Sequence, residues 1–175
     1  MTVSAPQALN LKLPPHSMEA EAAVLGSLML DNSAWEKVGD MINSGDFYKS
    51  EHKFIFQAIV GLLEQNKPAD VVTVFESLKS VDTVSNFGGI EYLNSLAQAS
   101  PSVSNIKGYA EIIRDQSILR RLISVSEEIS SLALNSNRKE TRMILDEAES
   151  KIFKISEDRA RGNSGLKDFD QLLTH

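Results

Sequence analysis

The side chains best suited to metal binding or proton transfer are three histidines, and they stand far apart in the sequence, at His16, His52 and His175. None has a second histidine or carboxylate at the spacing of a zinc site. The sequence contains no cysteine, so thiolate nucleophiles and cysteine-based metal sites are excluded. We therefore predict no metal site and interpret each histidine as a packing or surface residue.

Carboxylate pairs are the next candidates, because paired acids can act as general acid and base. Glu19 stands with Glu21, and Glu127 with Glu128. Both pairs are interpreted as helix-capping charges or solvated faces. No Gly-x-x-x-x-Gly-Lys-Ser/Thr or Gly-x-Gly-x-x-Gly motif is present to hold a nucleotide. We predict no catalytic residue, although a triad assembled in space keeps an isolated hydrolase open as an alternative.

Arginines are confined to the second part of the chain, where the first is Arg114. Acidic neighbours at helical spacing favour a solvated, ion-paired face, while contact with phosphates is the other interpretation. A net charge of −6 argues against duplex DNA binding as the main role. A free-standing nucleic-acid-binding adaptor is kept as the alternative function. The basic residues concerned are Arg114, Arg120, Arg121, Arg138, Lys139 and Arg142.

Length and composition are typical of one folded domain or a small domain with an appendage, since 42% of the 175 residues are apolar. No run of about 18 apolar residues could span a bilayer, and no signal peptide is visible. We expect a cytoplasmic protein with no membrane partner. Residues 1–102 hold 6 Lys against 12 acids, whereas residues 103–175 hold 12 Lys and Arg against 12 acids. That change in net charge marks a candidate boundary.

The first part of the chain reads as an extended arm followed by five short helices. Ser17 and Ser50 are candidate N-caps, Asp70 is a candidate entry into the fourth helix, and Gly88-Gly89 precedes the fifth. Apolar residues recur at helical spacing in each segment. The expected helices lie at about 17–30, 35–42, 50–65, 70–78 and 90–97.

The second part is predicted to be an antiparallel helical hairpin. A helix from Ser102 or Ser104 to about Leu134 and another over about 141–155 each carry an apolar stripe that steps by four and three residues. The first stripe consists of Ile118, Leu122, Val125, Ile129 and Leu132, and the second of Thr141, Leu145, Ala148, Ile152 and Ile155. Other apolar residues lie off these stripes and are expected to stay partly exposed until partner helices cover them. We predict an oligomer interface at Leu119, Ile144 and Phe153, and Ile123 also lies off the stripe.

The last residues are expected to form a linker and the start of a further helix. Residues 157–165 are charged and glycine-interrupted, which is a linker composition, so residues 157–164 are predicted to be mobile. An amphipathic stretch follows and stops after one or two turns, so we expect the chain to be a fragment of a longer protein. The apolar residues of this stretch are Leu166, Phe169, Leu172 and Leu173.

These patterns predict an all-α protein with a compact multi-helix head followed by an antiparallel helical hairpin. The expected divisions are an arm at 1–15, a head at 16–101, a hairpin at 102–156 and a linker segment at 157–175.

Seven short motifs, in order over about residues 11–155, give the chain a resemblance to a known family. They begin with Leu13-Pro14-Pro15-His16-Ser17-Met18-Glu19-Ala20-Glu21 and include Asp46-Phe47-Tyr48, Gly88-Gly89 with Tyr92-Leu93, and Leu119-Arg120-Arg121-Leu122-Ile123. The chain resembles the amino-terminal domain and linker of bacterial DnaB-type replicative DNA helicases.

The resemblance implies a docking domain whose ATPase motor domain, with its ATP and Mg, is missing. In that family six copies form a collar, as a trimer of dimers, that binds the helicase-binding domain of bacterial primase. A helicase loader is a further partner of the whole protein, and DNA contact through this domain is expected to be weak. The segment with Leu166, Phe169, Leu172 and Leu173 resembles the linker helix that docks on a neighbouring motor domain.

The same resemblance implies which residues contact primase. The family uses the tyrosine after the Gly-Gly pair and apolar residues of the first hairpin helix, which correspond here to Tyr92, Ile123 and Ile129. Ile129 also belongs to the apolar stripe, so its alternative role is in the hairpin core.

Overall fold

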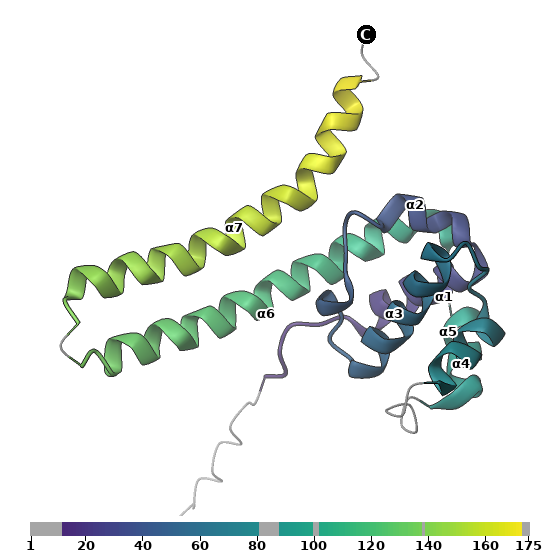
Figure 1. Ribbon diagram of the computed structural model, residues 1–175, viewed down its shortest axis with the longest axis horizontal. Helices are drawn as coiled ribbons and strands as arrows, with labels where there is room; N and C mark the ends of the chain where they lie inside the picture. Colours follow the sequence, from purple (N-terminus) through teal and green to yellow (C-terminus); the bar gives the residue numbers. More distant parts are fainter. Residues whose placement is uncertain (1–11, 81–87, 100–101, 138, 173–175) are drawn as a thin grey trace, which may run out of the picture.

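The computed structural model describes residues 12–80, 88–99, 102–137 and 139–172, with side chains to residue 160. Within these ranges the chain is helical and contains no strand, which confirms the predicted all-α head and hairpin (Figure 1). None of the described helices is long and apolar enough to cross a membrane. The helices are α1 (Met18–Leu30), α2 (Trp35–Val38), α3 (Ser50–Glu64), α4 (Val71–Lys79), α5 (Gly89–Gln98), α6 (Ile106–Leu134) and α7 (Thr141–Leu172), with short 3-10 turns at Asn32–Ala34, Ser44–Asp46 and Val103–Asn105.

Helix α1 is the centre of the head. Its N-cap is Ser17, as predicted, and the Ser17 hydroxyl accepts a hydrogen bond from the Ala20 N–H at 3.2 Å. The helix packs against α3, α5 and α6, and nine of its thirteen residues are buried. A helix buried on nearly all sides must be apolar nearly all round, which explains why α1 has no marked polar face.

The caps of α3 and α4 differ in origin. Asp70 caps α4 as expected, since its carboxylate accepts the Thr73 N–H at 2.9 Å and the Thr73 hydroxyl accepts the Asp70 N–H at 2.8 Å. The prediction that Ser50 caps α3 was wrong, because the cap position is Lys49 and no side chain of its own segment caps the helix. A carboxylate from α1 binds the backbone there instead.

Helix α2 is shorter than its apolar spacing predicted. It ends at Val38, and the N–H of Met41 turns back to the Val38 carbonyl at 2.9 Å. Met41 and Ile42 are buried even so. The apolar spacing that predicted a helix to residue 42 is therefore explained by burial of these two side chains in a turn.

Helix α6 belongs to both parts of the molecule. Ile106, Ala110 and Ile113 from its first turns are buried in the core of the head, and the rest of the helix extends beyond the head (Figure 1). The head core therefore includes residues C-terminal to the predicted boundary at residue 102. Because one continuous helix leaves the head, the direction of the hairpin is fixed by head packing.

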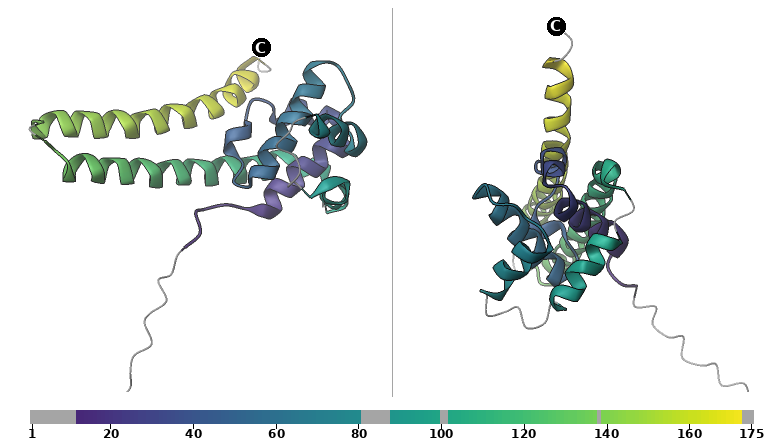
Figure 2. Two further views of the ribbon diagram at one scale, coloured as in Figure 1. Left: turned by 60° about the horizontal axis from the view of Figure 1, so that its bottom comes forward. Right: turned by 90° about the vertical axis from the view of Figure 1, so that its right-hand side faces the viewer.

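Helix α7 returns antiparallel to α6 and lies beside it in Figure 1 and in the left view of Figure 2. It continues to Leu172, across the residues at 157–165 whose composition indicated a linker. Gly162 and Gly165 each weaken a helix by about 1 kcal/mol relative to alanine, which a long helix without proline tolerates. Its last turns bend away from α6 (Figure 1). Mobility of residues 157–164 stays a prediction.

Asn32 ties the end of α1 to the entry of α4 and gives a test of the fold. Its amide donates to the carbonyls of Leu28 and Ala69, both at 2.8 Å, and accepts the Ala69 N–H at 3.0 Å. We expect Asn32→Ala to lower the free energy of unfolding by about 1–3 kcal/mol, because buried backbone groups lose their partners. Urea unfolding measures this, and Asn94→Ala on the exposed side of α5 is the control. Equal losses in the two variants would contradict the assignment.

Candidate partner-docking surfaces

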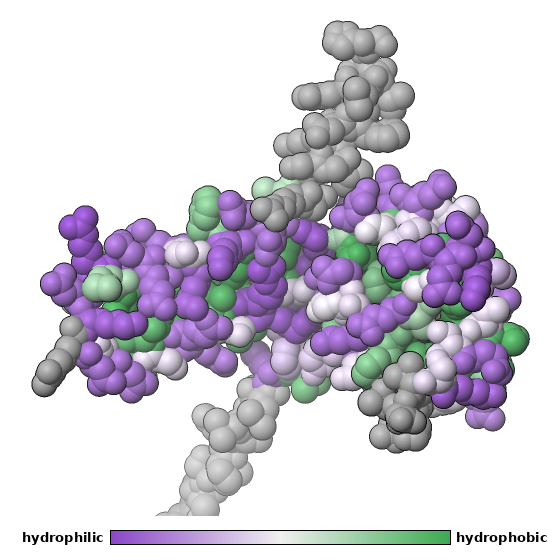
Figure 3. All heavy atoms as spheres, viewed as in Figure 1, coloured by the Kyte–Doolittle hydropathy of each residue, from purple (hydrophilic) through white to green (hydrophobic). Residues whose placement is uncertain are grey.

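The hairpin exposes an unusual amount of apolar surface. Leu119, Ile123 and Phe153 are 43%, 45% and 62% exposed, in agreement with their positions off the predicted stripes, and Ile144 is half-buried. Figure 3 shows apolar side chains among hydrophilic ones along the hairpin. Beyond the first turns of α6, which pack in the head, the exposed large apolar residues of the hairpin are Leu119, Leu122, Ile123, Leu134, Met143, Leu145, Ile152 and Phe153. Such a surface on a helical pair is typical of a protein interface.

The two hairpin helices bury less of their apolar stripes than the spacing predicted. Only Ile155 on the α7 stripe is buried, and Leu122 on the α6 stripe is 45% exposed. Ile129, a predicted primase contact with an alternative role in the hairpin core, is half-buried. Two helices alone therefore leave part of both stripes in water.

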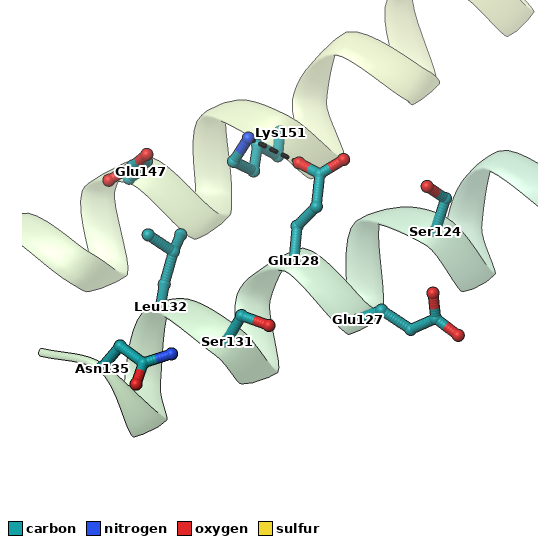
Figure 4. Close-up of a pocket in the computed structure, with 8 residues that line it drawn as sticks. All are labelled: Ser124, Glu127, Glu128, Ser131, Leu132, Asn135, Glu147 and Lys151. Carbon is teal, nitrogen blue, oxygen red and sulfur yellow. Dashed lines mark hydrogen bonds and ion pairs between the residues drawn. The ribbon is translucent and has the colours of Figure 1, made fainter.

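A groove between α6 and α7 lies towards the hairpin turn (Figure 4). Across the groove, Lys151 on α7 forms an ion pair with Glu128 on α6 at 2.7 Å. The hydrogen bond to Glu128 raises the pKa of Lys151. Leu132 points from α6 towards α7. The residues along its walls are mostly of polar types: Ser124, Glu127, Glu128, Ser131, Leu132, Asn135, Glu147 and Lys151.

Tyr92, the third predicted primase contact, lies on α5 in the head and is half-buried. Its hydroxyl lies 2.6 Å from His52 Nε2 and 3.1 Å from Lys49 Nζ. The Tyr92 and His52 rings are nearly parallel with centroids 6.0 Å apart, and Lys49 Nζ lies 4.4 Å from the Tyr92 centroid. Tyr92 is thus part of a polar network, which its sequence position did not predict. Ile123 lies on the part of α6 beyond the head, so the two predicted contacts stand in different parts of the molecule.

A buried acid anchors this network. Glu21 and His52 are each 1% exposed, and Glu21 Oε1 lies 2.7 Å from His52 Nδ1. The Glu21 carboxylate also accepts the N–H groups of Tyr48 at 2.9 Å and Lys49 at 3.3 Å. The interpretation of Glu21 as a capping charge or solvated residue of its own helix was therefore wrong. Its spacing of three, four and seven from buried apolar residues of α1 could have predicted burial.

Burial alone would raise the pKa of Glu21, because it disfavours the charged form. Hydrogen bonds from His52 and from the Tyr48 N–H, together with the attraction of His52, outweigh this effect. The pKa of Glu21 is lowered overall, so Glu21 is held as a carboxylate.

Of the basic residues named from the sequence, Arg114 and Arg120 bind backbone carbonyls, whereas Arg121 and Lys139 form ion pairs with carboxylates, as the sequence favoured. Arg114 donates to the Met41 carbonyl at 2.7 Å and to the Asp158 carbonyl, so one guanidinium joins α7 to the head. Arg121 pairs with the Asp158 carboxylate at 2.6 Å. Arg114 therefore holds α7 against the head, and Arg121 ties α7 to α6.

Arg120 fastens the N-terminal arm in the same region. It donates to the carbonyls of Pro15 at 2.7 Å and Asp46 at 2.6 Å. His16 stacks on Tyr48 with ring centroids 4.3 Å apart, so this histidine has a packing role, as predicted. The guanidinium N–H groups of Arg120 that phosphate binding would need are therefore already bound to backbone carbonyls.

Some predicted positions fall where the structure gives no side-chain description. Arg138 lies outside the described residues, and so do the side chains of Leu166, Phe169, Leu172 and Leu173. Among the described residues, no three His, Asp or Glu side chains gather as a metal site would require.

Comparison with known proteins identifies the family. The DnaB-like helicase N-terminal domain family matches residues 13–115. The chain is 42% identical over 161 residues to the replicative DNA helicase DnaB of Pasteurella multocida, which covers 92% of this chain and 34% of that protein. DnaB of Geobacillus stearothermophilus is 36% identical over 86% of this chain and 33% of its own length.

Solved structures of DnaB N-terminal domains share the fold. That of Mycobacterium tuberculosis superposes with a TM-score of 0.76 at 30% identity, over 81% of this chain and 99% of the other. That of Helicobacter pylori, whose description includes its interactions with primase, gives a TM-score of 0.59 at 26% identity over 67% of this chain and 91% of the other.

The chain belongs to the DnaB-like helicase N-terminal domain family. It spans about a third of the length of the curated relatives it matches.

The buried carboxylate predicts a pH dependence of stability. Because the pKa of Glu21 is lower in the folded protein than in the unfolded chain, its contribution is fully present above the unfolded pKa and is lost as the pH falls through the folded pKa. We expect wild-type stability to fall, as the pH drops below about 5, more steeply than that of Glu21→Gln, which is less stable at neutral pH. Urea unfolding across this range measures the difference, and parallel curves would contradict the role of Glu21.

Proposed function

We propose that this chain is the collar and docking domain of a bacterial replicative DNA helicase, where it supports hexamer assembly and binds primase during DNA replication. Membership in the family supports this function, and the observation that carries it is the exposed apolar surface of the hairpin. On this proposal, ATP and Mg belong to a motor domain elsewhere in the whole protein, which unwinds DNA in the cytoplasm. The domain itself hydrolyses no ATP and contacts DNA only weakly.

Self-association through the hairpin is supported by side chains that one copy leaves in water. Full burial of a Leu or Phe side chain contributes about 1.5–3 kcal/mol, so several such residues can hold a dimer. We assign Leu119, Ile144 and Phe153 to this interface. In the whole protein we assign Leu166, Phe169, Leu172 and Leu173 to docking on a neighbouring motor domain, and a helicase loader is a further partner.

Primase binding is assigned to Tyr92, Ile123 and Ile129. A primase interaction is described for the similar domain of Helicobacter pylori, and 45% exposure leaves Ile123 free to contact a partner. Ile129 is half-buried and contributes less surface.

The nucleic-acid-binding adaptor is the less favoured function. Arg114 and Arg120 already donate to backbone carbonyls, and the net charge is −6. Binding to single-stranded DNA at two salt concentrations separates the two functions, since a phosphate-driven interaction weakens steeply with salt.

Hairpin association gives a direct test by sedimentation. Leu119→Asp or Phe153→Asp should weaken a dimer by at least about 1.5 kcal/mol, because a charge replaces apolar surface that association would bury. Lys154→Ala, at an exposed position beside Phe153, is the control. A strict monomer for the wild type at high concentration would overturn the self-association of this domain.

Primase binding is tested by calorimetric titration with the helicase-binding domain of the cognate primase. We expect Tyr92→Ala and Ile123→Asn each to reduce affinity at least about tenfold, as truncation at an interface hot spot does. Circular dichroism and oligomeric state should stay unchanged for Ile123→Asn, whose side chain is exposed. Wild-type affinity in both variants would remove these residues from the primase site.

A further inference from the structure

The four residues Glu21, His52, Tyr92 and Lys49 form one directed chain of hydrogen bonds. The ionised Glu21 carboxylate can only accept, so His52 Nδ1 carries a hydrogen and donates to it. In neutral His52 the other nitrogen, Nε2, is then an acceptor, and the Tyr92 hydroxyl donates its proton to it. Lys49 Nζ, which has no lone pair, donates to the Tyr92 oxygen. With Glu21 ionised and His52 neutral, the direction of every bond in the chain is fixed.

The backbone before Tyr92 fixes the ring in the same place. Gly88 has a φ of +94°, and a Cβ atom built there would lie 2.8 Å from the Tyr92 Cβ. Any larger residue would push Tyr92 away, which explains the glycine ahead of α5. With His52 hydrogen-bonded to its hydroxyl and Gly88 against its Cβ, Tyr92 is held at both ends.

The outward side of this chain is positively charged. An ammonium has three N–H donors, and Lys49 uses one of them on Tyr92. Glu21 does not compete for the others, because His52 and the backbone N–H groups of Tyr48 and Lys49 bind its two oxygens. Lys49 and Tyr92 are both half-buried, so each retains surface that a partner can contact.

We propose that His52, held by Glu21, is a positioning residue for the primase contact, and that the Tyr92–Lys49 pair binds a carboxylate of primase. With its proton turned inward, Tyr92 presents its ring edge and its oxygen, while Lys49 supplies the charged donors. An acidic side chain is the group that complements this arrangement. The inference rests on the proposed primase binding and adds the chemistry of the partner group and the residues that present it.

The test is titration of the cognate primase helicase-binding domain at about 0.05 M and about 0.5 M salt, because an ion pair near the surface weakens as salt screens it. Lys49→Met keeps the aliphatic stem and should bind about tenfold more weakly at low salt, with a flatter salt dependence. Lys67→Met, at an exposed position after α3, is the matched control and should bind as the wild type does.

Three further variants test the Tyr92–Lys49 pair and the positioning role of His52. Tyr92→Phe keeps the ring but removes the hydroxyl to which Lys49 donates, so this variant should bind primase more weakly. The double variant that adds Lys49→Met should bind only slightly more weakly than Tyr92→Phe alone. Glu21→Gln is nearly isosteric and can donate to His52 Nδ1, so that His52 Nε2 donates to the Tyr92 oxygen and the Tyr92 proton turns outward. An outward hydroxyl donates to a carboxylate, so this variant should bind primase more tightly than the wild type, while circular dichroism still reports a folded helical protein.

The outcomes separate the inference from the proposed function. If the wild type does not bind primase, the proposed function fails and the inference fails with it. If the wild type binds and Lys49→Met and Glu21→Gln match it at both salt concentrations, the inference alone is wrong. If Lys49→Met weakens binding equally at both salt concentrations, the partner group is not a carboxylate and the proposal is overturned.

Discussion

The buried carboxylate of Glu21 is the constraint on which the head depends. A charge that is 1% exposed costs several kcal/mol unless hydrogen bonds compensate it. Here the compensation comes from the backbone at the start of α3 and from His52, whose other nitrogen binds Tyr92 on α5. A single side chain of α1 therefore sets the positions of two other helices. It also replaces the local cap that α3 lacks.

The hairpin differs from the head, because its two helices alone cannot bury its apolar residues. The head encloses its core, whereas Leu122, Ile152 and Phe153 remain 45%, 47% and 62% exposed on the hairpin. Arg114 joins the two parts through backbone carbonyls, which do not vary with sequence and cannot be protonated away at neutral pH. The hairpin therefore extends from the head with part of its apolar surface uncovered. The arginine contacts and the continuous helix α6 together fix its direction.

The sequence predicted the helices well where local signals determine them. Ser17 and Asp70 were correct caps, because N-capping depends on residues within one turn. Glu21 was misread because its partners lie 27 to 31 positions away, at Tyr48, Lys49 and His52, where no local pattern connects them. For the same reason composition alone could not reveal that the arginines bind distant backbone carbonyls. Exposure of the off-stripe residues was predictable, since two helices can bury only one face each.

Two of the three predicted primase contacts, Tyr92 and Ile123, are supported by different parts of the structure. Ile123 lies on an exposed helix surface, so its contribution is apolar area and depends little on the rest of the head. Tyr92 is tied through His52 to a buried charge, so any change that perturbs α1 or α3 also moves the docking group. If one primase domain contacts both, part of its binding energy depends on the integrity of the head core. Substitutions far from the surface, at positions that pack around Glu21, would then alter primase affinity without touching primase.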